Sequence, residues 1–286
     1  SLGRPLLADP DYVNKLRAGR MAEIRPCISC QEGCMGRVQH YSMINCAVNP
    51  QCARERVTAY NPILQPKKVL IVGGGVAGCE AARVLALRGH RPELFEKNGQ
   101  LGGNLLPGGA PEFKEDDIAL AKWYEVQLKK LGVPVTLNSK VTKEQVLSGD
   151  YDTVIIATGS KPKVFPLGDD DKVYTAAQVL LKEKDCGAQT VVVGGGLVGC
   201  ETALWLAQNG KKVTIVEAMD KILALNGPLC SANKEMLELL VPYNGVEVVT
   251  GAKVTGYRDG ILTADVAGKI REIPCDSVVL SVGYRE

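Results

Sequence analysis

The sequence predicts an α/β protein with two copies of a parallel strand–helix–strand unit and a cysteine-rich segment ahead of both. The copies are VLIVGGGVAGCEAARVLALRGHRPELFEK from Val69 and VVVGGGLVGCETALWLAQNGKKVTIVEA from Val191, which align without a gap. Each has an apolar strand, a glycine turn, a helix with apolar residues three and four apart, a glycine stop and a second strand. Later apolar strands, residues 152–159 and 276–283, close the two copies.

Both glycine turns have the spacing GxGxxG. They consist of Gly73, Gly75 and Gly78 in the first copy and of Gly194, Gly196 and Gly199 in the second. The first glycine permits a tight turn, the second lets the backbone approach a pyrophosphate, and the third allows close packing of helix on strand. The free N–H groups of the following helix favour an anion there. One such turn is equally compatible with a plain bend, but two in full context predict two Rossmann-like dinucleotide sites.

An acidic residue follows the second strand of each copy. Glu96 and Glu217 occupy the position where a carboxylate can accept hydrogen bonds from an adenosine ribose. A 2′-phosphate would be repelled by Glu217, so the sequence favours NADH over NADPH at the second site. Lys221 and the Lys211–Lys212 pair leave room for the alternative, because one of them could reach a phosphate.

Four cysteines ahead of the first copy follow the spacing C-x2-C-x3-C-x11-C. They are Cys27, Cys30, Cys34 and Cys46. Such clustering indicates metal binding, and four thiolates suit an iron–sulfur cluster. Structural zinc is the alternative, although such sites usually have two C-x2-C pairs and this segment has one. Buried thiols without metal are a third reading. We expect no chemistry from the remaining cysteines, which are Cys52, Cys79, Cys186, Cys200, Cys230 and Cys275.

Composition narrows the class of protein further. The 286 residues suggest about two domains, and 34 basic against 32 acidic residues give a formal net charge of +2, which does not favour nucleic-acid binding. No apolar run reaches the roughly 18 residues of a membrane span, and the N-terminal residues lack a signal pattern. We therefore expect a cytoplasmic protein with a small-molecule substrate and no membrane partner. Assembly into a homo-oligomer stays open.

The segment RPC-x2-C-x3-C-x11-C-x2-NP followed by tandem glycine folds resembles the old yellow enzyme-related iron–sulfur flavoproteins. That family includes 2,4-dienoyl-CoA reductase, 2-enoate reductase, NADH oxidase-like proteins and trimethylamine dehydrogenase. The resemblance covers nearly the whole chain. It implies a 4Fe-4S cluster between an FMN-bearing β/α barrel and an FAD domain into which an NAD(P)H domain is inserted.

The resemblance also implies roles for individual residues. The motif cysteines would be the cluster ligands, and the second glycine turn with Glu217 would hold the nicotinamide cofactor. The residues implied to hold FAD are Gly73, Gly75, Gly78 and Glu96, with Gly102, Gly103 and Asn104 near the flavin and Ala157, Thr158 and Gly159 at the return turn.

Two departures from the family pattern concern the ends of the chain. The segment GRPLLADP resembles only the last turn of the barrel, where Arg4 would contact the FMN phosphate, so nearly all of the barrel is expected to lie outside this sequence. The chain also stops before the family's final flavin-site segment. The predicted domains are 1–62 for the barrel end and cluster segment, 63–172 for FAD, 173–282 for NAD(H), and 283–286 for a truncated return to the FAD domain.

The function implied is electron input: NADH reduces FAD, and electrons pass singly through the cluster to FMN for reduction of an enone or enoyl-type substrate, or for an NADH oxidase activity. We predict no catalytic acid or base in this chain, because the cofactors carry the chemistry. Three alternative functions are considered. A dithiol disulfide reductase needs cysteines beside the flavin, and residues 100–114 contain none. An amine dehydrogenase would not need the second glycine turn, and a zinc-stabilised nucleotide-binding subunit would not be an enzyme.

Overall fold

The structure is a computed structural model that describes residues 2–224 and 229–286. The chain divides into two compact units, Ser1–Gly159 and Ser160–Glu286. None of the helices in the described ranges combines the length and apolar character that a bilayer crossing requires. The domain boundaries at residues 62, 172 and 282 stay predictions, since internal contacts divide the chain only near Gly159.

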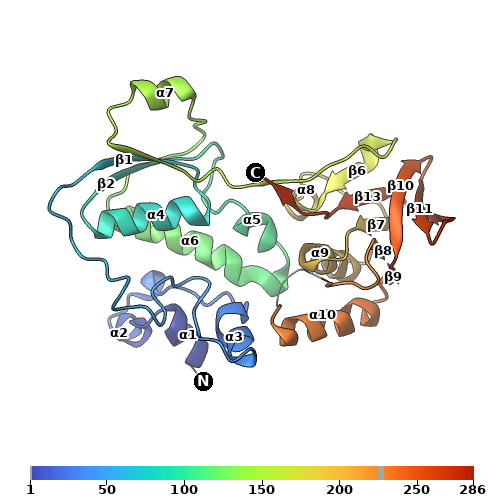
Figure 1. Cartoon of the computed structure of the whole chain (residues 1–286), viewed down its shortest axis with the longest axis horizontal. Coiled ribbons are helices and arrows are strands. Elements are labelled where there is room, and N and C mark those ends of the chain that lie inside the picture. The colour runs from blue at the N-terminus through green and yellow to red at the C-terminus, as the bar shows by residue number, and fades with distance from the viewer. Residues whose placement is uncertain (1, 225–228) are drawn as a thin grey trace. The chain divides into compact units, whose positions relative to one another are not determined.

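The first unit is built on a four-stranded parallel sheet. Its strands, in spatial order, are β3 (Val135–Thr136), β2 (Arg91–Phe95), β1 (Lys68–Val72) and β4 (Thr153–Ile156). Helices α4 (Val76–Leu87) and α6 (Glu115–Lys130) lie side by side against one face of it (Figure 1). Ile71, Leu94 and Tyr124 are almost completely buried between sheet and helices. The predicted strand–turn–helix–strand order is confirmed in this copy.

The remaining elements of the first unit are short. They are α1 (Gly3–Ala8), α2 (Tyr12–Arg17), η1 (Met21–Glu23), the π-helical turn η2 (Glu32–Gly36), α3 (Arg37–Gln39), α5 (Leu105–Gly108), η3 (Glu112–Lys114) and α7 (Lys143–Ser148). Ala8 and Val48 are buried in the same core as the sheet, and Cys27 and Cys46 pack against it. The cysteine-rich segment therefore shares one hydrophobic core with the first Rossmann-like fold.

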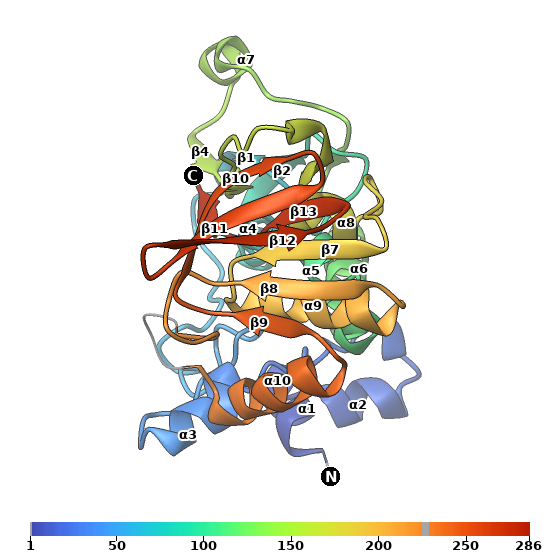
Figure 2. The same cartoon turned by 90° about the vertical axis from the view of Figure 1, so that its right-hand side faces the viewer.

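The second unit has a five-stranded parallel sheet. Its strands, in spatial order, are β6 (Val173–Thr175), β13 (Ser277–Leu280), β7 (Gln189–Val193), β8 (Lys212–Val216) and β9 (Glu247–Val249). Figure 2 shows β7, β8 and β9 running side by side, with α9 (Leu197–Gln208) and α10 (Ser231–Tyr243) nearby. An antiparallel sheet consists of β10 (Ala252–Arg258), β11 (Ile261–Val266) and β12 (Lys269–Pro274).

Several small elements complete this unit. They are β5 (Lys161–Pro162), which pairs with β14 (Tyr284–Arg285), together with η4 (Asp170–Lys172) and α8 (Ala176–Leu180). The predicted closing strands of both repeats are present as β4 and β13, each hydrogen-bonded in parallel to the strand that opens its repeat. The predicted α/β fold with two Rossmann-like domains and a cysteine-rich segment ahead of them is therefore confirmed.

The third glycine of each turn permits the close approach that the motif predicts. A Cβ on Gly78 would collide with the carbonyl oxygen of Gly73, and a Cβ on Gly199 would collide with that of Gly194. Glycine is also required at the first position of each turn, because φ is +111° at Gly73 and +104° at Gly194. Helix and strand could not pack at this separation around a larger residue.

We expect Gly78→Ala to lower the free energy of unfolding by about 1–3 kcal/mol, the usual cost of forcing extra atoms into a packed site. Chemical denaturation of the cofactor-free protein measures it. Gly75→Ala is the matched control, because its Cβ would meet nothing closer than the Cα of Gly103 at 3.9 Å. Equal stability of the two variants would contradict the packing role assigned to Gly78.

Candidate functional site

The first glycine turn is closed by the acidic residue that follows β2. The backbone N–H of Gly74 donates to Glu96 Oε2 at 2.7 Å, and the N–H of Asn98 donates to Oε1 at 2.8 Å. Only 6% of Glu96 is exposed. These contacts hold the carboxylate at the mouth of the turn, and each of its oxygens keeps a lone pair that a ribose hydroxyl could use.

The second turn repeats this arrangement. The N–H of Gly195 donates to Glu217 Oε2 at 2.5 Å, and the N–H of Met219 donates to Oε1 at 2.7 Å. Because the same two backbone donors are used in both units, Glu96 and Glu217 fix the shape of their turns before any ligand arrives. The predicted ribose contacts stay predictions.

The return turns after the closing strands lie directly against the first glycines. The N–H of Ala157 donates to the Val72 carbonyl at 2.8 Å, and a Cβ on Gly73 would collide with the Ala157 carbonyl and come within 3.3 Å of the Thr158 Cα. Gly159 follows with φ of +67°. In the second unit, Ser281 takes the corresponding place beside Gly194. The structure thus brings the predicted return turn and glycine turn together.

A short segment that contains Gly102 and Gly103, which we call the strap, crosses the first glycine turn. Gly102 N–H donates to the Gly74 carbonyl at 2.9 Å, and a Cβ on Gly103 would lie 3.0 Å from the Gly75 Cα. Asn104 follows as the N-cap residue of α5, and its carbonyl accepts a hydrogen bond from Gly108 N–H at 3.1 Å. The residues predicted to lie near the flavin are therefore adjacent to the turn predicted to hold its pyrophosphate.

The second unit has a matching strap that sequence comparison missed. Leu223 N–H donates to the Gly195 carbonyl at 2.8 Å, as Gly102 does to Gly74, and Leu223 has φ of +55°. Ile222 packs where a Cβ on Gly195 would lie, as Leu101 does for Gly74. Extending the gap-free alignment of the two copies would have paired the two straps. The two glycines of the first strap are leucine and alanine in the second, so the two segments share no identical residue at these positions.

The second glycine turn opens into a cavity of about 760 Å³. Gly194, Gly196, Glu217, Lys253 and Tyr284 contribute to its walls, which are otherwise largely apolar. This size suits a small-molecule or cofactor site. Lys253 is a cation at this cavity that the sequence analysis did not single out, because β10 is remote from the glycine motif in the chain.

Each turn also carries a buried thiol beneath it. Cys79 Sγ donates to the Gly74 carbonyl at 3.3 Å, and Cys200 Sγ donates to the Gly195 carbonyl at 3.4 Å. Burial raises the pKa of both thiols to about 12. Since the thiolate is the reactive form, neither is suited to exchange with a disulfide. The six cysteines outside the motif are all buried, as expected for thiols without chemistry.

The four motif cysteines occupy one irregular loop of the first unit. Asn45 N–H donates to the Gly33 carbonyl at 2.7 Å, which brings Cys34 and Cys46, the residues that follow these two, into the same region. Ser29 and Gln31, on either side of Cys30, have left-handed φ values of 55° and 58°. Such backbone conformations and π-helical turns concentrate at functional sites.

The four thiols of this loop are neighbours. Burial raises the pKa of the Cys30 thiol, and the thiols of the other three motif cysteines raise it further. Within the described residues, no group of three His, Cys, Asp or Glu side chains is arranged to hold a metal ion. A tetrahedral zinc with Zn–S bonds of about 2.3 Å would need sulfurs about 3.8 Å apart. A four-iron cluster spreads its thiolates more widely, because each binds a different iron, and four cysteine thiolates are the donor set that such a cluster takes.

Arg4 lies at the edge of an open depression of about 860 Å³ in the first unit. Cys27, Ser29, Gln31 and Asp116 line the same depression. The predicted phosphate ligand and the first predicted cluster ligand therefore share one concave surface. The role of Arg4 toward FMN stays a prediction.

A family comparison matches this arrangement of folds. The model described as pyridine nucleotide-disulphide oxidoreductase matches residues 67–286. The chain belongs to this family. Its members bind FAD and a pyridine nucleotide on paired Rossmann-type folds, and both are therefore supported here as cofactors.

Individual relatives resemble the chain over its whole length. Cinnamate reductase of Clostridium sporogenes is 50% identical over 99% of this chain and 43% of that protein. NADH oxidase of Thermoanaerobacter brockii is 38% identical over 99% of this chain and 44% of that protein. The structure of a 2-naphthoyl-CoA reductase has a TM-score of 0.91 at 30% identity, covering 98% of this chain and 43% of that one.

The chain thus spans less than half the length of these relatives. They confirm the resemblance to flavoprotein oxidoreductases of the reductase and NADH oxidase type that the cysteine and glycine motifs predicted. The residue assignments within the sites are not tested by these comparisons and stay predictions.

We expect Cys79 and Cys200 to resist alkylation by iodoacetamide at pH 8, because burial and a pKa of about 12 leave almost no thiolate. Peptide mass spectrometry of the native protein, with urea-unfolded protein as the control, measures it. Rapid native labelling of Cys79 would show an accessible thiol beside the first turn and would revive the disulfide reductase reading.

Proposed function

We propose that this chain is the electron-input part of an NADH-dependent iron–sulfur flavoprotein oxidoreductase. NADH would bind at the second glycine turn, FAD at the first, and a 4Fe-4S cluster at the motif cysteines. The electrons would leave toward FMN in a barrel domain. The observation that carries the proposal is the closure of a glycine turn by a carboxylate in both units, with a loop of four neighbouring thiols in the first of them.

The chain's own residues would bind and orient these groups. Gly75 leaves space for a pyrophosphate, Gly73 and Gly78 permit the tight turn and close packing around it, and the start of α4 directs N–H groups toward it. Glu96 is held in place to accept ribose hydroxyls. When bound, FAD supplies conversion between two-electron and one-electron transfer, and the cluster accepts single electrons.

The motif cysteines would act as thiolates toward the cluster. The raised pKa of the Cys30 thiol does not oppose this, because a coordinating metal deprotonates a thiol outright. All ten cysteines of the chain are thiols rather than disulfide partners. That state fits the reducing cytoplasm, which we propose as the location.

The substrate would be an unsaturated acyl or enone compound, reduced at the barrel. The names of the relatives support this class, since they include a reductase of cinnamate and one of 2-naphthoyl-CoA. An NADH oxidase activity is the second candidate, favoured by the relative that carries that name. The cavity at the second turn favours nicotinamide use over an amine dehydrogenase. The spacing of the motif cysteines, with a single C-x2-C pair, disfavours a zinc-stabilised subunit.

The anaerobic visible spectrum of the full-length protein, before and after NADH, tests the proposal. We expect flavin bands on a broad iron–sulfur absorbance, with both decreasing when NADH is added. Cys30→Ser should lose iron and sulfide and retain the flavin response, whereas Cys52→Ser, outside the motif, should keep both. A wild-type spectrum that NADH does not change would remove the electron-input role.

We expect Glu217→Gln to weaken NADH binding relative to NADPH by roughly tenfold, because a hydrogen bond to a charged group is worth about 1.5 kcal/mol or more and the repulsion of a 2′-phosphate is relieved. Ratios of kcat/KM for the two nucleotides measure the change. Glu96→Gln makes the same substitution at the first turn and should leave that ratio unaltered. An unaltered ratio in Glu217→Gln would show that this carboxylate does not read the ribose.

A further inference from the structure

Helix α6 joins the cysteine-rich segment along a single stripe. Three of its side chains make polar contacts with residues 23–29, and these are Asp116, Trp123 and Lys130. They are seven residues apart, a spacing of about two helical turns, so they lie on the same side of the helix. We call them the α6 stripe.

The first contact of the stripe reaches between two of the predicted cluster ligands. Ser29 Oγ donates to Asp116 Oδ2 at 3.0 Å. Ser29 stands between Cys27 and Cys30 in the chain and has φ of +55°. Because few residues favour that backbone conformation, a side-chain hydrogen bond that holds it also fixes where the two flanking thiols lie.

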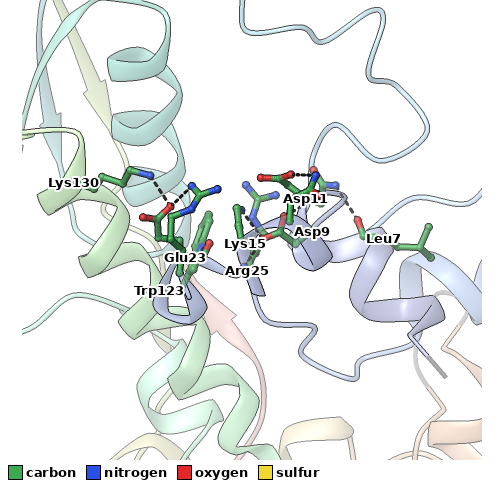
Figure 3. A network of polar contacts seen from close by, with 11 residues as sticks. Leu7, Asp9, Asp11, Lys15, Glu23, Arg25, Trp123 and Lys130 are labelled. Atoms are coloured by element: carbon green, nitrogen blue, oxygen red, sulfur yellow. Dashed lines mark hydrogen bonds and ion pairs between the residues drawn. The ribbon is translucent and has the colours of Figure 1, made fainter. Parts of the chain in front are cut away.

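The other two contacts hold the approach to the cysteine loop (Figure 3). Trp123 Nε1 donates to the Glu23 carbonyl at 2.9 Å, and the guanidinium of Arg25 lies 4.6 Å from the centre of the Trp123 ring. Lys130 Nζ donates to Glu23 Oε2 at 2.6 Å. Trp123 and Arg25 are buried, so their stacking is worth more than the half-exposed Lys130 pair.

Another side of α6 contacts the strap predicted to lie near the flavin. A Cβ on Gly102 would lie 3.0 Å from the Ala121 Cβ, and a Cβ on Gly109 would lie 2.8 Å from Ile118. No larger residue could separate helix and strap at these points. The same rigid element therefore touches the flavin strap and the cysteine loop within its first two turns.

We propose that the α6 stripe consists of positioning residues that set the separation and orientation of the thiol loop relative to the flavin strap. This rests on the proposed function. The Asp116–Ser29 hydrogen bond is exposed, but it is the contact of the stripe nearest to the predicted cluster ligands in the chain. NADH would supply two electrons as a hydride to the flavin and leave as NAD⁺, and the iron–sulfur centre would accept those electrons one at a time. Two transfers would therefore be needed for each NADH, and each would depend on the placement that α6 maintains.

Stopped-flow mixing of NADH with the anaerobic holoprotein tests this, with freeze-quench electron paramagnetic resonance to follow the iron–sulfur centre. Asp116→Ala should leave the rate of flavin bleaching unchanged and slow reduction of the centre. We expect a several-fold decrease, because electron transfer slows as the two centres move apart and two anchors of the stripe remain. Ser29→Ala removes the same hydrogen bond from the other side and should slow reduction of the iron–sulfur centre to the same extent. It also provides the measurement if Asp116→Ala does not retain iron.

Two comparisons separate positioning from a general structural or charge effect. Glu115→Ala removes the same charge from the same helical turn at an exposed side chain, and should behave as wild type. The double variant Asp116→Ala/Ser29→Ala should be no slower than either single variant, because all three lack one shared interaction. Asp116→Asn keeps an acceptor oxygen and should largely restore the rate.

The outcomes distinguish this proposal from the proposed function. Equal rates of reduction of the iron–sulfur centre in Asp116→Ala and Glu115→Ala, with FAD and iron present in both, would overturn the positioning role alone. Additive slowing in the double variant would also overturn it. A wild-type protein without iron and sulfide, or without flavin bleaching by NADH, would overturn the proposed function as well.

Discussion

The structure depends on one interaction made twice: a carboxylate at the end of a second strand accepts the N–H of the middle residue of a glycine turn. Gly74 donates to Glu96 and Gly195 donates to Glu217, at 2.7 and 2.5 Å. The bond joins the strand end to the turn, so the helix start faces the same opening as the carboxylate. An anion-favouring helix start and a hydroxyl acceptor are thereby placed together, which is what an adenine dinucleotide requires.

The first unit differs from the second because it carries a cysteine loop in addition to the Rossmann-like fold. The cysteine loop packs into the core of the same fold through Cys27, Cys46 and Val48. Polar contacts from α6 hold the residues that lead into it. A single core and a single helix therefore contact both the segment around Gly102 and the loop of the motif cysteines. The second unit instead opens into a cavity suited to a ligand that arrives and leaves.

Much of the fold could be predicted because it depends on local patterns. Gly73 and Gly78 are required by backbone geometry, and the apolar strands beside them can be recognised from a few residues. The placement of the thiols could not be predicted, since it depends on left-handed Ser29 and Gln31 and on the pairing of Asn45 with Gly33, which no spacing rule contains.

Two further features escaped sequence reasoning for related reasons. The second strap was hidden because Leu223 adopts a conformation usually left to glycine. The contacts of α6 could not be recognised in the sequence because its partners lie about ninety or more residues earlier in the chain. The three residues of its stripe, Asp116, Trp123 and Lys130, are also an acid, an aromatic residue and a base, so they form no recognisable pattern. A heptad spacing becomes informative only when the opposing segment is known.

We expect the two carboxylate-closed turns to be separate dinucleotide sites. Calorimetric titration of NAD⁺ into protein already saturated with FAD tests it most directly, because NAD⁺ cannot reduce the flavin. We expect one FAD to be retained per chain and one NAD⁺ to bind in addition, without release of flavin into the filtrate. Displacement of FAD by NAD⁺, or no NAD⁺ binding while FAD is present, would contradict it.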